Sequence, residues 1–277
     1  MKRDTNSPVA EGPMQIDVAG VLRQRLGARA SHVPAWLVRR LERLICQDKL
    51  NEMLRVAYPR RGADFCRAVT SHLGVSLDIS GADRLPASPR VLIVSNHPLG
   101  GLDGMALIEA FDGLYPGGLK FVVNDLLNAV EPLSDVFLPI NKHGAQSRDA
   151  VRAIDEAFAS GRPVLMFPAG LCSRRRKGTV ADLEWQKMFV QKARQSGRPI
   201  VPVHFTGRNS DRFYRWASWR ERLGIRFNFE MVLLPSEVFR AEGSRFEIRI
   251  GAPVDVAHLP ADARAAAAEI RKLVYSL

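Results

Sequence analysis

The stretch VLIVSNHPLGGLDGMALIEAF, residues 91–111, decides how this chain folds. It opens on five consecutive apolar or small residues (91–95), a run that is typical of a strand buried on both faces. Two adjacent glycines, Gly100 and Gly101, then mark a tight turn, and apolar residues with helical spacing follow. A buried strand that leads through a short turn into a helix is the repeating unit of parallel α/β sheets.

The residues downstream repeat this alternation of strand and helix. Helical patterns over 150–158 and 185–193 separate short apolar runs, and an Ala-rich helix is expected over 260–275. Residues 246–250 alternate apolar with charged side chains, as a half-exposed strand does. The sequence therefore predicts an α/β fold with a mostly parallel or mixed sheet flanked by helices. The other strand candidates are LKFVV (119–123), VFLPI (136–140), VLMFP (164–168) and IVPVHF (200–205).

The N-terminal part of the chain lacks this alternation of strand and helix patterns. We expect a disordered leader over 1–13, an N-terminal helical segment over 14–80 and the motif-bearing domain over 81–277. Within the helical segment, residues 34–58 have the pattern of an amphipathic helix with a basic face. Two interpretations of this helix stay open: it contacts a membrane surface, or it packs as an ordinary helix.

Charge is the unusual feature of the composition. The 277 residues include 40 Lys and Arg against 29 Asp and Glu, a net charge of +11. More than half of this excess falls in residues 1–90, which hold 15 basic and 9 acidic residues. A chain this basic is expected to meet an anionic partner: nucleic acid, an anionic membrane or a phosphorylated small molecule. The 46% hydrophobic content excludes a chain that is disordered throughout.

Cysteine use and the chain start indicate a cytoplasmic protein. The three cysteines show no CxxC spacing, which fits a reducing compartment rather than a disulfide framework. The first residues lack the apolar core of a signal peptide. The charge-free stretch over 91–102 has twelve residues, too few for a bilayer that needs about 20. The six histidines show no metal-ligand spacing, so no bound metal is expected.

The candidate chemistry lies directly after the first buried strand. His97 follows this strand, and Asp103 stands at the start of the next helix. Ligands of open α/β sheets gather at the carboxyl ends of strands, so a His and an Asp there form a plausible base and its orienting partner. The imidazole would accept the proton of an alcohol, and the carboxylate would hold it in one tautomer. The alternative is that His97 only ends the strand and Asp103 only caps the helix.

Three sequence blocks resemble the glycerolipid acyltransferase family, in particular its haemolysin-like bacterial branch. They are Asn-His followed by Asp (96–103), Phe-Pro-Ala-Gly (167–170) and Ile-Val-Pro-Val (200–203). The resemblance spans roughly residues 85–210. Two departures from the family pattern stand out: five residues separate His97 from Asp103 instead of four, and Ala169 replaces the usual Glu. The basic residue of the second block also falls later, at Arg174.

The resemblance implies a role for individual residues. His97 and Asp103 would be catalytic, and backbone N–H groups near Gly100 and Gly101 are candidates for holding the oxyanion. Apart from the resemblance, Cys172 lies near the proposed site and is a weaker candidate for an acyl-carrying nucleophile, which the family mechanism does not need. Basic side chains would grip a phosphate of the acceptor. The expected substrate-binding residues are Asn96, Gly100, Gly101, Gly170, Ser173, Arg174 and Lys142.

The function implied is an O-acyltransferase of membrane lipid biosynthesis. A fatty acyl group would pass from an acyl carrier protein or coenzyme A thioester to the hydroxyl of a lysolipid, either lysophosphatidate or a lyso-aminolipid such as lyso-ornithine lipid. No cofactor is needed beyond this co-substrate. The protein would sit peripherally on the inner face of the cell membrane, attracted by anionic lipid. The alternative is a non-catalytic basic protein that binds anionic lipid or nucleic acid, although no nucleic-acid-binding signature is present.

Overall fold

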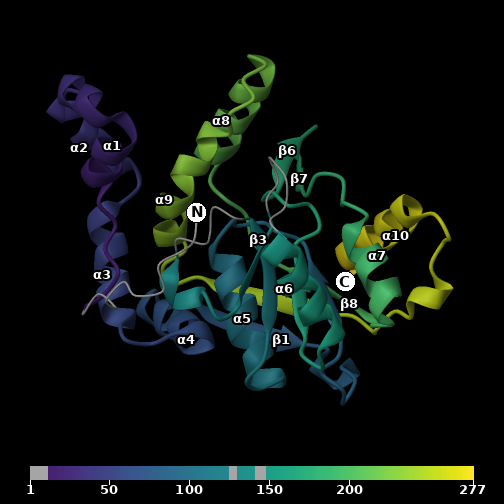
Figure 1. The fold of residues 1–277 in the computed structure, drawn as a ribbon. Helices are drawn as coiled ribbons and strands as arrows, with labels where there is room; N and C mark the ends of the chain where they lie inside the picture. Colours follow the sequence, from purple (N-terminus) through teal and green to yellow (C-terminus); the bar gives the residue numbers. More distant parts are fainter. Residues whose placement is uncertain (1–11, 125–129, 141–147) are drawn as a thin grey trace.

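A seven-stranded mixed sheet forms the centre of the computed structural model, which describes residues 12–124, 130–140 and 148–277 (Figure 1). The strand order is β1-β9-β8-β2-β5-β3-β4. Strands β8, β2, β5, β3 and β4 run parallel, β9 is antiparallel to β8, and β1 is parallel to β9. The predicted α/β class is confirmed. The strands span Ser76–Ser80 (β1), Leu92–Ser95 (β2), Lys120–Asn124 (β3), Phe137–Ile140 (β4), Val164–Met166 (β5), Ile200–Phe205 (β8) and Arg245–Ile250 (β9).

Helices cover both faces of this sheet, and further helices extend away from it (Figure 1). They comprise α1 (Val18–Leu26), α2 (Ala35–Leu44), α3 (Gln47–Ala57), α4 (Gly62–His72), α5 (Leu102–Leu114), α6 (Arg148–Ala159), α7 (Met188–Ser196), α8 (Asp211–Arg222), α9 (Leu234–Arg240) and α10 (Ala263–Ser276). Side chains of β2 alternate between the two faces. Ile93 packs in the core formed with α4 and α5, whereas Leu92 and Val94 pack in the core formed with α6, α7 and α10.

The strand before the candidate site lies in the middle of the sheet. All four residues of β2 are buried, and the strand pairs in parallel with β5 on one side and β8 on the other. Burial on both faces explains the continuous apolar run in the sequence. Because three parallel strands end side by side here, the loops that follow β2, β5 and β8 meet at one edge of the sheet.

The N-terminal helices are less embedded than the rest. The helix expected over 34–58 is divided into α2 and α3, because Cys46 adopts the left-handed conformation between them (φ +55°). Neither α1 nor α2 contains a buried residue. Among the helices that the structure describes, none is both long and apolar enough to cross a membrane.

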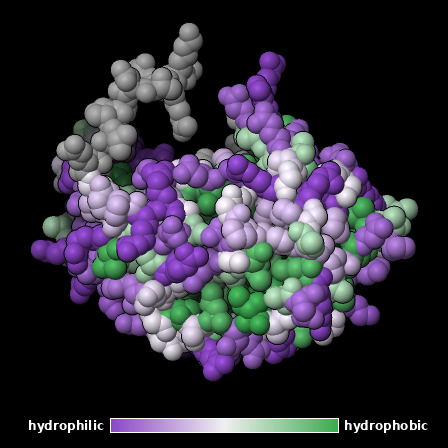
Figure 2. Space-filling model, turned by 90° about the horizontal axis from the view of Figure 1, so that it is seen from below, coloured by the Kyte–Doolittle hydropathy of each residue, from purple (hydrophilic) through white to green (hydrophobic). Residues whose placement is uncertain are grey.

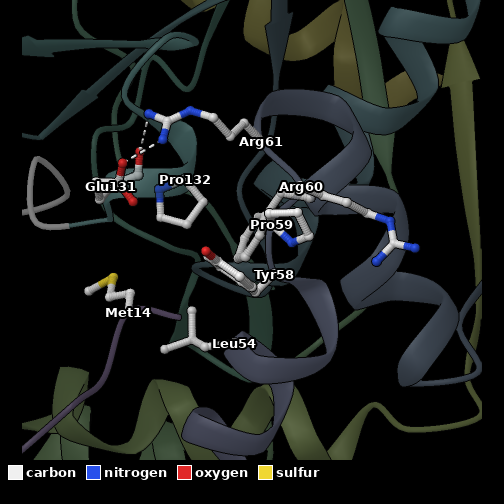
Figure 3. Close-up of a pocket in the computed structure, with 9 residues that line it drawn as sticks. Met14, Leu54, Tyr58, Pro59, Arg60, Arg61, Glu131 and Pro132 are labelled. Atoms are coloured by element: carbon white, nitrogen blue, oxygen red, sulfur yellow. Dashed lines mark hydrogen bonds and ion pairs between the residues drawn. The ribbon is translucent and has the colours of Figure 1, made fainter. Parts of the chain in front are cut away.

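Arg61 joins the N-terminal helical segment to the domain that carries the sheet. Its guanidinium lies 2.5 Å from Glu131 Oε1 and donates to Ser134 Oγ at 2.9 Å and to Asp135 Oδ2 at 3.3 Å. Figure 3 shows the arginine reaching across to Glu131 beside a small cavity near Tyr58. The cavity volume is about 30 Å³, room for a water molecule rather than for a substrate.

One face of the molecular surface carries an apolar patch (Figure 2). Seen from below, opposite the side to which α8 rises, hydrophilic residues alternate with an apolar patch near the lower edge of the view (Figure 2). Segments of a second, two-stranded sheet, β6 (Arg174–Arg176) and β7 (Thr179–Ala181), lie on the α8 side. The two strands form a hairpin in which Lys177 and Gly178 both take positive φ and close a tight turn.

Candidate active site

His97 and Asp103 form a hydrogen-bonded pair at the carboxyl end of β2. The imidazole Nδ1 lies 2.9 Å from the carboxylate Oδ2. Asp103 is fully buried, whereas the His97 side chain keeps 16% of its surface exposed. No hydrogen bond to the second ring nitrogen, Nε2, is seen within the described residues. A pair of this kind holds a proton on Nδ1 and leaves Nε2 to accept one from a substrate.

The Asp103 carboxylate is held ionised by His97 and by the backbone N–H groups around it. Its Oδ2 accepts hydrogen bonds from the N–H groups of Leu99 (2.8 Å) and Gly100 (3.4 Å), and its Oδ1 accepts from Gly104 (2.9 Å). Burial alone would raise the pKa of this carboxyl. The charge and hydrogen bond of His97, together with the N–H groups of Leu99 and Gly100, outweigh burial, so the pKa lies below its ordinary value.

The Gly-Gly turn accommodates the extra residue between His97 and Asp103. Gly100 has φ +83°, in the left-handed region that favours glycine. A Cβ built on Gly100 would come within 2.9 Å of the Leu234 side chain and 3.2 Å of Cys172. This turn brings Asp103, in the first turn of α5, back against the imidazole. The Gly100 N–H points to the carboxylate, so the structure gives it a different role from the oxyanion donor we expected.

Phe167 and Asp182 fix His97 from two further directions, and sequence reasoning assigned neither a role. The Phe167 ring stacks on the imidazole with centroids 3.9 Å apart and an interplanar angle of 19°. The buried Asp182 accepts hydrogen bonds from the His97 backbone N–H (3.2 Å), Ser173 Oγ (2.6 Å) and the indole N–H of Trp185 (3.0 Å). No motif surrounds Asp182 in the sequence, and its contact with the His97 backbone joins residues 85 positions apart.

Two residues that we expected to bind substrate instead help to hold the loop around His97 in place. The Asn96 side chain accepts from the Phe205 N–H at 2.7 Å and donates to the Phe205 carbonyl at 2.9 Å, tying the end of β2 to the end of β8. The backbone N–H of Ser173 donates to the His97 carbonyl at 2.7 Å. Asn96 is 3% and Ser173 2% exposed, so the structure places both behind the imidazole.

Arg174 is the clearest correction to the expected site. We expected it to grip a phosphate, but it is 2% exposed and its Nη2 lies 2.9 Å from Glu230 Oε1. Glu230 is itself fully buried, and its Oε2 lies 3.0 Å from Arg220 Nε. The next arginine, Arg175, pairs with Asp211. Arg174 and Arg175 are therefore paired with acids from the segment after α8 and from α8 itself, which the local sequence does not reveal.

Cys172 is unsuited to carry an acyl group. Its thiol is fully buried, and burial raises its pKa to about 11 even though the Arg174 guanidinium lies 3.0 Å from its Sγ. A thiol with this pKa is protonated near neutral pH, and only the thiolate is a good nucleophile.

The remaining expectations are placed as follows. Gly101 lies in the turn before α5, and its carbonyl accepts from the Met105 N–H at 3.2 Å. Gly170 (φ +67°) closes the turn after β5 through a hydrogen bond to the Phe167 carbonyl at 3.0 Å. Lys142 falls outside the described residues. In the part of the chain that the structure describes, no cluster of three or more His, Cys, Asp or Glu could hold a metal ion.

Breaking the buried Arg174–Glu230 pair is expected to destabilise the fold. Arg174→Met leaves the fully buried Glu230 with one cation fewer, and removing one partner of a buried ion pair costs roughly 3–5 kcal/mol. Arg175→Met is the matched control, because its pair with Asp211 is partly exposed and such pairs contribute about 0–1 kcal/mol. Urea unfolding of both variants measures the difference. Equal free energies of unfolding for the two variants would contradict the buried pairing.

Known proteins that are similar to this chain are acyltransferases. A family model described as "Acyltransferase" matches residues 20–277. The chain is 41% identical over 239 residues to a lyso-glycine lipid O-acyltransferase of Phocaeicola vulgatus, covering 86% of each chain. It is 40% identical to the protein of the same name from Bacteroides thetaiotaomicron, covering 86% of this chain and 88% of that one. The crystal structure of PlsC, the 1-acyl-sn-glycerophosphate acyltransferase of Thermotoga maritima, is 15% identical with a TM-score of 0.45, over 87% of this chain and 92% of that one.

Proposed function

The chain belongs to the acyltransferase family and is a lysolipid O-acyltransferase, and we propose that its acceptor is a lysolipid with an amino-acid head group. The acyl donor in this proposal is a thioester of acyl carrier protein or coenzyme A. The observation that supports the chemistry best is the 2.9 Å contact between His97 Nδ1 and the buried Asp103 carboxylate. The family match also extends through the N-terminal helices, beyond the three sequence blocks.

The mechanism follows from the orientation of the imidazole. Asp103 accepts a hydrogen bond from the Nδ1–H group and stays ionised, so Nε2 of the neutral ring accepts the proton of the lysolipid hydroxyl as that oxygen attacks the thioester carbonyl. A tetrahedral intermediate forms and collapses with cleavage of the carbon–sulfur bond. The imidazolium then returns the proton to the departing thiolate, which leaves as a free thiol. No enzyme nucleophile is required, in keeping with the protonated state of Cys172.

Two observations favour an amino-acid head group over phosphate. Two relatives at 40–41% identity are lyso-glycine lipid O-acyltransferases by name. In addition, Arg174, the expected phosphate ligand, is buried against Glu230 and has no exposed guanidinium to offer. Lysophosphatidate, our other candidate acceptor, therefore serves as the comparison substrate. A lyso-glycine or lyso-ornithine lipid is the acceptor that we propose.

The N-terminal segment supports a peripheral position on the inner face of the membrane. Helices α1 and α2 bury no residue, and Trp36 of α2 is 60% exposed. Basic residues accompany these apolar ones, and such a surface is attracted to anionic lipid. This is the membrane-contacting interpretation of residues 34–58, now assigned to α2 and the start of α3.

A panel of acceptors tests the proposal. The purified protein is given labelled acyl carrier protein or coenzyme A thioester with lyso-glycine lipid, lyso-ornithine lipid or lysophosphatidate. We expect transfer to one or both amino-acid lysolipids at least ten-fold faster than to lysophosphatidate, on the order of the discrimination that one unmatched polar group produces. Preferential acylation of lysophosphatidate would overturn the proposed acceptor. No transfer to any lysolipid, with salt-sensitive binding to anionic vesicles or RNA, would favour the non-catalytic alternative.

A further inference from the structure

The outer end of α8 exposes a set of large apolar side chains that the active site does not use. Trp219 is 66% exposed, Leu223 71%, Ile225 40% and Phe227 73%. All residues over 221–227 are exposed. Exposed aromatic and aliphatic side chains that lie close together mark a surface that binds a membrane or another protein. We call residues 219–227 the α8 tip.

Arginines surround these apolar residues. The segment over 211–228 contains five arginines and two acidic residues. Arg222 and Arg226 are exposed within the tip itself, and Arg212 and Arg215 are exposed along α8. A combination of Trp, Phe and Leu with flanking arginines is typical of segments that enter the interface of an anionic bilayer.

The inner end of α8 is fixed to the loop that carries His97. The Asn209 side chain donates to the Pro98 carbonyl at 3.2 Å, and the Asn209 N–H donates to Tyr214 Oη at 3.0 Å. Ser210 caps α8 and is held by Glu237 of α9 through hydrogen bonds of 2.6 and 2.7 Å. The direction of α8 is therefore set relative to the catalytic base. Its 12 residues span about 18 Å, so the tip stands about that far from the loop.

The tip and the exposed N-terminal helices rise on the same side of the molecule. Figure 1 shows α1 and α2 at one side of the view and α8 beside them, all extending away from the sheet. Trp36 of α2 and Trp219 of α8 are both at least 60% exposed. Because the inner end of α8 is fixed to the loop that carries His97, both projections rise on the side of the sheet at which His97 lies (Figure 1). A bilayer that holds a lysolipid substrate would approach His97 from this side.

We propose that the α8 tip inserts Trp219, Leu223 and Phe227 into the interface of an anionic phospholipid bilayer. The arginines of the tip then lie at the level of the anionic head groups, and α8 holds the His97 loop at a fixed height below them. A second copy of the chain is a poorer occupant. Stable protein interfaces bury about 800 Å² per partner, and a narrow tip with four large apolar side chains offers little of that area.

Vesicle binding by the full chain tests this insertion without an acyl donor, so its outcome is independent of the proposed acceptor. The combined variant Trp219→Ser, Leu223→Ser and Phe227→Ser is compared with the wild type. The probes are vesicles that contain phosphatidylglycerol and vesicles of phosphatidylcholine alone. We expect the variant to lose about 10- to 100-fold in partitioning to the anionic vesicles, with an unchanged melting temperature, because three exposed apolar anchors are lost. The matched control, Ile79→Ser with Val151→Ser, removes exposed apolar side chains elsewhere and should bind like the wild type.

Two further measurements test the role of the tip arginines and the depth to which Trp219 enters the bilayer. Arg222→Gln with Arg226→Gln should weaken binding to anionic vesicles and leave binding to neutral vesicles unchanged. Brominated lipids should quench tryptophan fluorescence more in the wild type than in Trp219→Phe. Equal quenching in both, or wild-type vesicle binding by the triple variant, would overturn the proposal. A wild-type dimer that the triple variant converts to a monomer, with vesicle binding unchanged, would instead assign the tip to self-association.

Discussion

Replacing His97 with alanine is expected to lower acyl transfer by roughly 10³- to 10⁴-fold, the upper range of general-base catalysis. The imidazole is the partly exposed member of the pair, and in the proposed mechanism its Nε2 accepts the proton of the lysolipid hydroxyl. Without it, the hydroxyl has no base at the strand end, because Asp103 is fully buried behind the ring. Initial rates with saturating acyl donor and an amino-acid lysolipid give the measurement.

The fold should tolerate this change. His97→Ala removes a ring that stacks on Phe167, but the backbone contacts of residue 97 with Asp182 and Ser173 remain. Circular dichroism and thermal unfolding show whether the variant is folded. His258→Ala is the matched control, since His258 is exposed on a separate 3₁₀ turn and should leave the rate unchanged. A folded His97→Ala variant with wild-type rates would remove His97 from the mechanism.

The pairing of His97 with Asp103 was predictable from sequence because both residues belong to one local unit. A buried strand, a glycine turn and a helix start lie within residues 91–103, so chain connectivity alone brings the two side chains near one another. The strand over 200–205 was predicted with its correct bounds for a similar reason. Apart from His204, its residues are apolar, and the strand lies inside the sheet.

The ion pairs of the arginines after the second block were not predictable in this way. The partners of Arg174 and Arg175 are Glu230 and Asp211, which lie 56 and 36 residues further along the chain. A single sequence shows that a charge run is present but not whether tertiary structure neutralises it. Asp182 was missed for the same physical reason, since its contact with the His97 backbone spans 85 residues.

Edge elements and helix breaks also escaped prediction. Strand β1 was not expected, because Leu77 and Ile79 alternate with polar residues at the edge of the sheet and form no continuous apolar run. The division of the 34–58 helix at Cys46 carries no sequence signal. Left-handed backbone usually marks glycine or asparagine, and the residue here is a cysteine.

Replacing Asp103 with asparagine is expected to lower acyl transfer by about 10³- to 10⁴-fold while keeping the shape of the side chain, as loss of a carboxylate that orients a catalytic histidine does. The carboxylate accepts from His97 and from three backbone N–H groups. An asparagine has one oxygen to accept with, so one orientation turns its NH₂ group toward the imidazole and the other turns it toward the Gly104 N–H. Either orientation loses the negative charge that stabilises the imidazolium.

The pH dependence of stability separates this electrostatic role from simple packing. The folded-state pKa of Asp103 lies below its ordinary value of 3.8. Its ionised form therefore contributes stability that is fully present above the unfolded pKa and is lost as the pH falls through the folded pKa. Asp103→Asn lacks this contribution at every pH. The gap in free energy of unfolding between wild type and variant should thus shrink as the pH falls below about 4.

Two matched measurements complete the test. Asp112→Asn changes a partly exposed carboxylate near the other end of α5 and should leave the rate unchanged. The double variant His97→Ala with Asp103→Asn should be no slower than His97→Ala alone, because residues that act as one unit are not additive. If the two losses multiplied instead, Asp103 would act on the reaction by a route that does not pass through the imidazole, and the 2.9 Å contact would be structural only.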